Sequence, residues 1–206
     1  KGYAIDFLLK KIAEDFGDEA YDAYLIFDAD NLVEENFRRI FRAIKDSAFV
    51  MPPMTNPIDD FSFAQTGASV GEKINPFYKV KIAHNGLDLI AAAGEPVHAA
   101  ADGVVENVTK SRKGLGNVVT INHGNGYRTR YAHLADIEVR KGRNVKRGTR
   151  IGYVGMSGNS FAPHLHYEVL RDTLVLDPVH YFFASVSPEE YVNMLIMSAS
   201  TGQSMD

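Results

Sequence analysis

The sequence holds 206 residues, of which 45% are hydrophobic and 23% charged, an ordinary balance for a folded globular chain. Its formal net charge of -4 lies in residues 1–50, with 7 Lys/Arg and 11 Asp/Glu, while the remainder carries 15 of each. This balance argues against nucleic acid as a partner. The absence of cysteine excludes disulfides and cysteine–zinc sites. No run reaches the roughly 18–20 apolar residues that a transmembrane segment needs.

Residues 1–50 show a helix–strand–helix pattern. Apolar residues recur at helical spacing in 5–12 and 37–44, and the run 24–27 is typical of a short buried strand. We therefore expect a small α/β extension. The sequence starts at Lys1 with no basic-then-apolar leader, so we interpret it as a fragment or processed form. Any export signal would then lie outside it.

A proline-rich stretch begins at Met51, and the sequence changes in character there. We predict that residues 51–206 form a second domain. Short runs rich in Val, Ile and Tyr alternate with glycine, and Asn125-Gly126 between two of them predicts a two-residue hairpin. Ser187 and Glu190 have the spacing of a capping box and predict a C-terminal helix. The predicted fold is mainly β, an antiparallel sheet or open barrel. The expected strands are 103–105, 117–121, 127–131, 151–154 and 164–170.

Two pairs of polar residues in the second domain suit a metal. On a strand, His164 and His166 project from the same face, and on an extended segment His84 and Asp88 also share a face. Imidazole and carboxylate both bind zinc, and three protein ligands plus a water form the open arrangement of a catalytic zinc. A lone His-x-His arises often by chance. The combination of both pairs with His133 in a β-rich chain favours a site.

The remaining histidines have no such neighbouring metal-binding residues in the sequence. We interpret His98, His123 and His180 as structural or surface residues.

Residues 51–206 resemble the M23 family of metallopeptidases, of the lysostaphin and LytM type, which cut peptide cross-links in bacterial cell walls. The matching segments follow the family order and are His84-Asn-Gly-Leu-Asp88, Gly94-Glu-Pro-Val, Ala101-Asp-Gly-Val-Val, Gly116-Asn-Val-Val, Asn122-His-Gly-Asn-Gly-Tyr, Tyr131-Ala-His-Leu, Val145-Lys-Arg-Gly, Ile151-Gly-Tyr-Val-Gly and Pro163-His-Leu-His-Tyr-Glu-Val.

The resemblance implies a zinc metalloendopeptidase acting on peptidoglycan peptides in the cell envelope, the periplasm or outside the cell. Its zinc ligands would be His84, Asp88 and His166. His133 and His164 would assist catalysis, one as general base and the other at the oxyanion, with the order left open. Tyr78 would lie near the oxyanion, although a core tyrosine is an equal alternative.

Two segments depart from the family pattern. Ser160-Phe161-Ala162 stands where Ser-Thr-Gly precedes His-Leu-His, and residues 66–71 replace a glycine-rich stretch. We expect both to line the rim of the substrate groove rather than the metal. They leave open a non-catalytic scaffold that activates other wall hydrolases. A biotinyl or lipoyl carrier domain is a further alternative, but the lysine it needs at a hairpin tip is missing.

Residues 1–47 are similar to a piece of a family 2 glycosyltransferase. Asp28 and Asp30 match the Asp-x-Asp of that family, which holds a divalent metal against a sugar nucleotide. The segment is too short for glycosyl transfer. We therefore interpret it as a fused remnant of that family.

Overall fold

The computed structural model describes residues 54–59, 62–181, 186 and 188–206, all of which belong to one compact unit, Val50–Asp206. The predicted α/β extension over 1–50 lies outside the described residues. The division into domains at residues 50 and 51 therefore remains a prediction.

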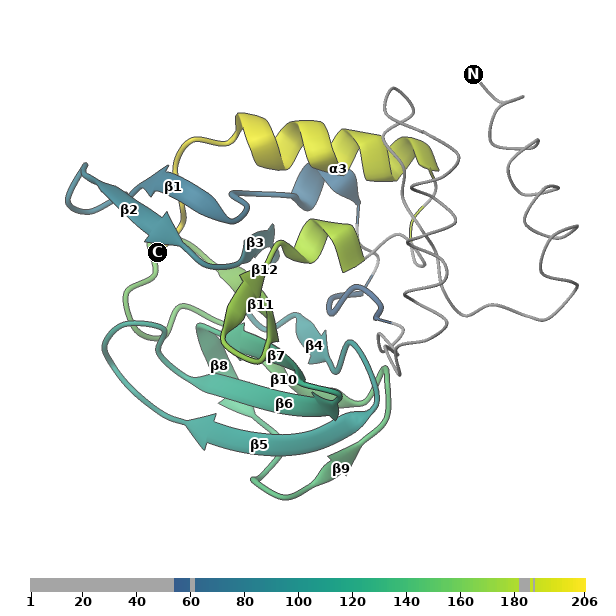
Figure 1. The fold of residues 1–206 in the computed structure, drawn as a ribbon. Helices are drawn as coiled ribbons and strands as arrows, with labels where there is room; N and C mark the ends of the chain where they lie inside the picture. Colours follow the sequence, from purple (N-terminus) through teal and green to yellow (C-terminus); the bar gives the residue numbers. More distant parts are fainter. Residues whose placement is uncertain (1–53, 60–61, 182–185, 187) are drawn as a thin grey trace, which may run out of the picture. The chain divides into compact units, whose positions relative to one another are not determined.

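The described part of the chain is built mainly from short strands (Figure 1). Glycine, proline and asparagine interrupt the β-branched and aromatic runs, which keeps each strand short. The strands are β1 (Gly71–Ile74), β2 (Lys81–His84), β3 (Leu87–Ile90), β4 (Pro96–His98), β5 (Gly103–Thr109), β6 (Val118–Gly124), β7 (Tyr127–Ala132), β8 (Leu134–Ile137), β9 (Asn144–Val145), β10 (Arg150–Val154), β11 (His164–Arg171) and β12 (Leu174–Leu176).

These strands form three open sheets, and every strand pair among the described residues is antiparallel. The largest sheet has the order β12-β11-β7-β6-β5-β9, with β3 paired to the other edge of β11. A second sheet has the order β4-β10-β8, and β1 and β2 form a hairpin of their own. The mainly β prediction is confirmed, and the sheets remain open.

Strand β11 separates the core from the polar face of the main sheet. Leu165, Tyr167 and Val169 point to the apolar side and are completely buried. Alternation then directs His164, His166 and Glu168 to the opposite face. Tyr131 of β7 packs beside Tyr167 with ring centroids 5.3 Å apart. The strand therefore presents two histidines from a rigid, well-packed support.

The turn between β6 and β7 is the predicted Asn125-Gly126 hairpin. Both residues have positive φ, 49° and 80°, as a type I′ turn requires. The predicted C-terminal helix is α3 (Pro188–Ser200), and two short 3₁₀ turns complete the elements, η1 (Phe63–Gln65) and η2 (Pro178–Tyr181). No helix in the described part of the chain is long and apolar enough to cross a membrane.

Candidate metal centre

His84 ends β2, and its ring is oriented by the segment that precedes β1. The Nδ1–H of His84 donates to the carbonyl of Ser69 at 2.9 Å. A carbonyl can only accept, so the proton sits on Nδ1 and the lone pair of the neutral ring lies on Nε2. The ring is almost completely buried. His84 thus offers one directed donor atom to the site.

Asp88 lies directly opposite His166 because of the register between β3 and β11. The backbone of Asp88 is fixed from its other edge, where Gly67 N–H donates to its carbonyl at 2.8 Å and its own N–H donates to Ala68 at 2.9 Å. The Oδ1 atom of Asp88 lies 3.0 Å from Nδ1 of His166 and 3.1 Å from Nε2 of His84. Strand pairing therefore brings the two halves of the sequence motif together.

His166 is oriented by Glu168, which shares its strand face and pairs with the half-buried Arg130 of β7. Its Nε2–H donates to Oε1 of Glu168 at 3.3 Å, and Oε2 of Glu168 accepts from Arg130 at 2.6 Å. When the ring is neutral, as a metal ligand must be, this carboxylate favours the tautomer in which Nδ1 carries the lone pair. Nδ1 of His166 then faces Nε2 of His84 at 3.1 Å.

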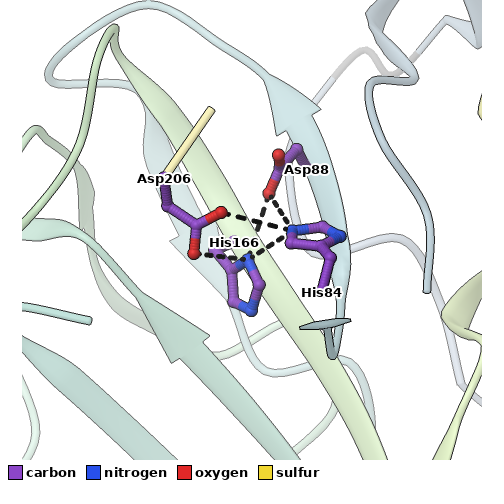
Figure 2. A group of neighbouring side chains, drawn as sticks. All are labelled: His84, Asp88, His166 and Asp206. Atoms are coloured by element: carbon purple, nitrogen blue, oxygen red, sulfur yellow. Dashed lines mark hydrogen bonds and ion pairs between the residues drawn. The ribbon is translucent and has the colours of Figure 1, made fainter. Parts of the chain in front are cut away.

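A fourth group, the side chain of Asp206, closes the cluster (Figure 2). Its Oδ1 lies 3.4 Å from Nε2 of His84, and its Oδ2 lies 3.7 Å from Nδ1 of His166. Tetrahedral ligands at about 2.0–2.2 Å from a zinc ion stand about 3.3–3.6 Å apart. The separations among His84, Asp88 and His166 lie within a few tenths of an ångström of that range, and one ligand atom from each of the four residues lies within 4.8 Å of the others, so these residues fit a metal ion.

The charges of the cluster also call for a cation. Burial lowers the pKa of His166, but hydrogen bonds with Asp88 and Glu168 outweigh it and raise the pKa to about 10. Burial lowers the pKa of His84, and the Asp88 carboxylate raises it by more. Burial opposes ionisation of Asp88, yet His166 and His84 hold the pKa of its carboxyl well below the usual range. The donor atoms thus stabilise positive charge between them, which a divalent metal supplies.

His133 and His164 stand beside the cluster with their rings 4.8 Å apart. Nδ1–H of His133 donates to the carbonyl of Ser157 at 2.7 Å, and Nδ1–H of His164 donates to the carbonyl of Ala162 at 2.8 Å. Both Nε2 atoms are buried and have no hydrogen-bond partner among the described residues. Burial lowers the pKa of His164, which favours its neutral form. The Nε2 atoms of His133 and His164 can therefore each accept a proton beside the metal-binding atoms.

His133 also has unusual backbone geometry. It lies between β7 and β8 with φ of 58°, a left-handed conformation that non-glycine residues rarely adopt. The backbone holds it there by two hydrogen bonds, from its N–H to Leu115 and from the N–H of Ser157 to its carbonyl. Strain of this kind is found most often at functional sites.

Tyr78 is the one predicted site residue that the structure does not bring to the cluster. It lies in the turn between β1 and β2, 73% exposed, and its N–H donates to the side chain of Asn75. The Asn75 side chain also accepts from Phe77 N–H and so fixes this turn. The oxyanion role of Tyr78 remains a prediction.

The two segments that depart from the family pattern lie closer to the site than the sequence suggested. Ser69 in segment 66–71 accepts the Nδ1–H of His84, and Ala162 accepts that of His164. Both contacts use backbone carbonyls, so the altered side chains leave the supports of these rings in place. The expectation that these segments only line the groove rim was therefore incomplete.

Sequence reasoning missed two residues of the site. Glu168 could have been found, because it stands two positions after His166 on a predicted strand and shares its face. Asp206 carries no motif and lies far from the other three residues in the sequence. Only the fold places it at the cluster.

The remaining histidines have other contacts. His98 lies 3.1 Å from Asp59, His123 binds Thr129 and the carbonyl of Asp102, and His180 contacts the Tyr191 hydroxyl.

Known proteins are similar to the part of the chain that contains the candidate metal centre. The profile of Peptidase family M23 covers residues 82–178. Over 98 residues the chain is 46% identical to the peptidoglycan DD-endopeptidase ShyA of Vibrio cholerae, and over 123 residues it is 40% identical to the DD-carboxypeptidase/endopeptidase Mpg of Neisseria meningitidis. These stretches are 48% and 59% of this chain but 23% and 28% of the relatives. The chain therefore spans about a quarter of the length of these relatives.

Two solved structures share the fold. A zinc-containing peptidase from Vibrio cholerae superposes with a TM-score of 0.54 at 37% identity, over 61% of this chain and 39% of that one. The catalytic domain of lysostaphin from Staphylococcus simulans gives 0.52 at 30% identity, over 56% of this chain and 90% of that domain. The profile match, the sequence identities and the shared fold agree, and residues 82–178 form a domain of peptidase family M23.

Proposed function

We propose that this chain is a zinc metalloendopeptidase that hydrolyses peptide cross-links of peptidoglycan in the cell envelope. The observation that carries the proposal is the meeting of His84, Asp88 and His166 at tetrahedral spacing beside two unpartnered imidazole nitrogens. A ligand set alone would suit a structural metal. The added nitrogens supply the proton transfers that hydrolysis needs.

Zinc is the metal that this donor set favours. Two neutral imidazoles and a carboxylate are typical zinc ligands, whereas calcium and magnesium prefer sites made of oxygen atoms alone. Glu168 and the carbonyl of Ser69 hold the outer nitrogens of His166 and His84, as expected around a metal-binding histidine. When bound, zinc supplies Lewis acidity and lowers the pKa of a water molecule toward about 7.

The two flanking histidines would carry out the proton transfer and stabilise the negative charge that develops on the substrate carbonyl oxygen. Nε2 of His164 lies 3.7 Å from Oδ1 of Asp88, and Nε2 of His133, in the turn between β7 and β8, lies 3.8 Å from Oδ2 of Asp206. A neutral Nε2 can accept a proton from the attacking water and later return it to the leaving amine. A protonated Nε2 can instead donate a hydrogen bond to the carbonyl oxygen as negative charge develops there. Because both Nδ1 protons are fixed on carbonyls, both rings keep Nε2 directed inward.

The substrate class follows from the relatives. ShyA is named a peptidoglycan DD-endopeptidase and Mpg a DD-carboxypeptidase/endopeptidase, and this chain resembles them over about half of its length. Peptidoglycan as substrate would place the protein in the cell envelope. The alternative of a non-catalytic scaffold predicts lost site residues. The three predicted ligands and the two flanking histidines are all present, which argues against the scaffold.

Metal analysis combined with a wall-digestion assay tests the proposal. The purified chain should carry about one zinc ion per molecule and release new amino groups from isolated peptidoglycan. His84→Ala and Asp88→Ala should each lose most of the metal and the activity, because each removes one of three ligands.

His180→Ala is the matched control, since it removes an exposed histidine whose ring forms a hydrogen bond with the Tyr191 hydroxyl and takes no part in the cluster. It should retain zinc and amine release. A wild-type chain that cannot take up zinc would overturn the proposal. A chain that binds zinc yet releases no amines from any peptidoglycan would favour the scaffold.

A further inference from the structure

Residues 201–206 follow α3 and run back across the candidate metal centre. Gln203 pairs with Ile74 of β1 in a parallel bridge, with Ile74 N–H donating to Gly202 at 2.8 Å and Ser204 N–H donating to Ile74 at 3.2 Å. The carbonyl of Asp206 accepts from the side chain of Asn75 at 3.0 Å. One edge of this segment is thus bound to β1 by backbone hydrogen bonds.

The other side of the segment is held by the site itself. Met205 N–H donates to Oδ2 of Asp88 at 2.9 Å, and the Met205 carbonyl accepts from Phe161 N–H at 2.8 Å. Asp88 therefore uses Oδ2 for this segment and keeps Oδ1 for the metal position. Residues 201–206 are joined both to a predicted ligand and to the loop that precedes His164.

These contacts direct the Asp206 carboxylate into the cluster (Figure 2). Its side chain is only 16% exposed, and Oδ1 has no hydrogen-bond partner among the described residues. Oδ1 lies 3.4 Å from His84 Nε2, and Oδ2 lies 3.7 Å from His166 Nδ1 and 3.8 Å from His133 Nε2. An unpartnered carboxylate oxygen is costly to bury unless a cation stands beside it. A metal held by the other three residues would provide that cation.

We infer that Asp206 is a fourth metal ligand and that residues 201–206 hold the site in a closed, latent form. This inference rests on the proposed function and deepens it by adding regulation. A catalytic zinc site keeps one position open, whereas four protein ligands make a closed site. Asp206 occupies the remaining corner and stands between the metal position and His133. The wild-type peptidase is therefore slow while the segment is paired with β1, and its rate rises when the segment leaves.

The test compares Asp206→Ala and Asp206→Asn with wild type in the full chain. Zinc affinity is measured by chelator competition. Asp206→Ala should weaken it at least about tenfold, since loss of an outer-sphere partner alone costs 10–100-fold. The visible spectrum of the cobalt-substituted protein is then recorded with and without azide. Azide should change the spectrum of Asp206→Ala and leave wild type unchanged, because only the variant has an open position. Amine release from peptidoglycan should rise in both variants.

Asp136→Asn is the control, because it makes the same change at an exposed position of β8. It should match wild type in all three measurements. Circular dichroism verifies that the variants are folded, and Asp206→Asn preserves the side-chain volume should Asp206→Ala misfold. Wild type that binds zinc, with an unchanged affinity and azide response in both Asp206 variants, overturns this inference and leaves the proposed function standing. Wild type that takes up no metal overturns the proposed function first.

Discussion

Nε2 of His84 and Nδ1 of His166 lie 3.1 Å apart although the two residues are 82 positions apart in the sequence. Their rings meet edge to face, with centroids 4.8 Å apart and planes at 80°. Ser69 and Glu168 hold the outer nitrogens, so both inner nitrogens face Asp88. Without a metal, the Asp88 carboxylate stabilises a proton on the inner nitrogen of His166, as the raised pKa of His166 indicates. A metal ion between the two nitrogens would replace that proton and be coordinated by both rings.

His133→Ala and His164→Ala should separate catalysis from metal binding. Each should retain zinc but lower the hydrolysis rate on the order of 10²–10³-fold, because each removes a proton-transfer or oxyanion partner. Zinc content and amine release from cross-linked peptidoglycan are the two measurements. Unchanged amine release in both variants would assign the chemistry to other residues.

Glu168→Gln should weaken zinc binding through His166. The neutral amide is a weaker acceptor for the Nε2–H of His166, and we expect a loss of about 10–100-fold in affinity by chelator competition. Glu106→Gln is a matched control, because Glu106 forms a comparable ion pair with Arg128 on the surface. Equal affinities in the two variants would mean that Glu168 does not position the histidine.

Gly86→Ala should disturb the site from inside the His84–Asp88 motif. A Cβ atom at Gly86 would stand 2.7 Å from Nε2 of His166 and 2.7 Å from the carbonyl oxygen of Tyr167. Since that carbonyl belongs to β11, the backbone must shift, at a cost of about 1–3 kcal/mol in stability. Thermal unfolding should show a lower Tm, and chelator competition a weaker zinc site.

Gly202→Ala provides the control for this change, because a Cβ there would meet no atom within 4 Å. It should unfold at the wild-type temperature. If Gly86→Ala did so too, with full zinc affinity, the close approach of Gly86 to β11 would have no energetic consequence.

Deletion of residues 1–47 should leave a folded, zinc-binding domain. The predicted ligands, the flanking histidines and the strands that carry them all lie beyond residue 70. Circular dichroism and metal analysis of the truncated chain are the measurements, with the full chain as reference. A truncated chain that fails to fold or loses zinc would show that the extension belongs to the core.

Local sequence determined much of the described fold. Asn125-Gly126 fixed a hairpin because both positions tolerate positive φ, and apolar runs between turn residues marked β5, β6, β7, β10 and β11. The spacing of two between His164 and His166 placed both on one face of β11. The same period would have revealed Glu168, because side-chain direction along a strand depends only on neighbouring positions.

Only the tertiary structure decided which side chains meet. The pairing of β3 with β11 sets Asp88 opposite His166, and no local pattern specifies that register. The exposure of Tyr78 follows from a turn fixed by Asn75, which its distance from His84 in the sequence does not reveal. Asp206 reaches the cluster because residues 201–206 pair with β1. Such contacts depend on the packing of segments far apart in the chain, and a sequence motif carries information only about residues near one another.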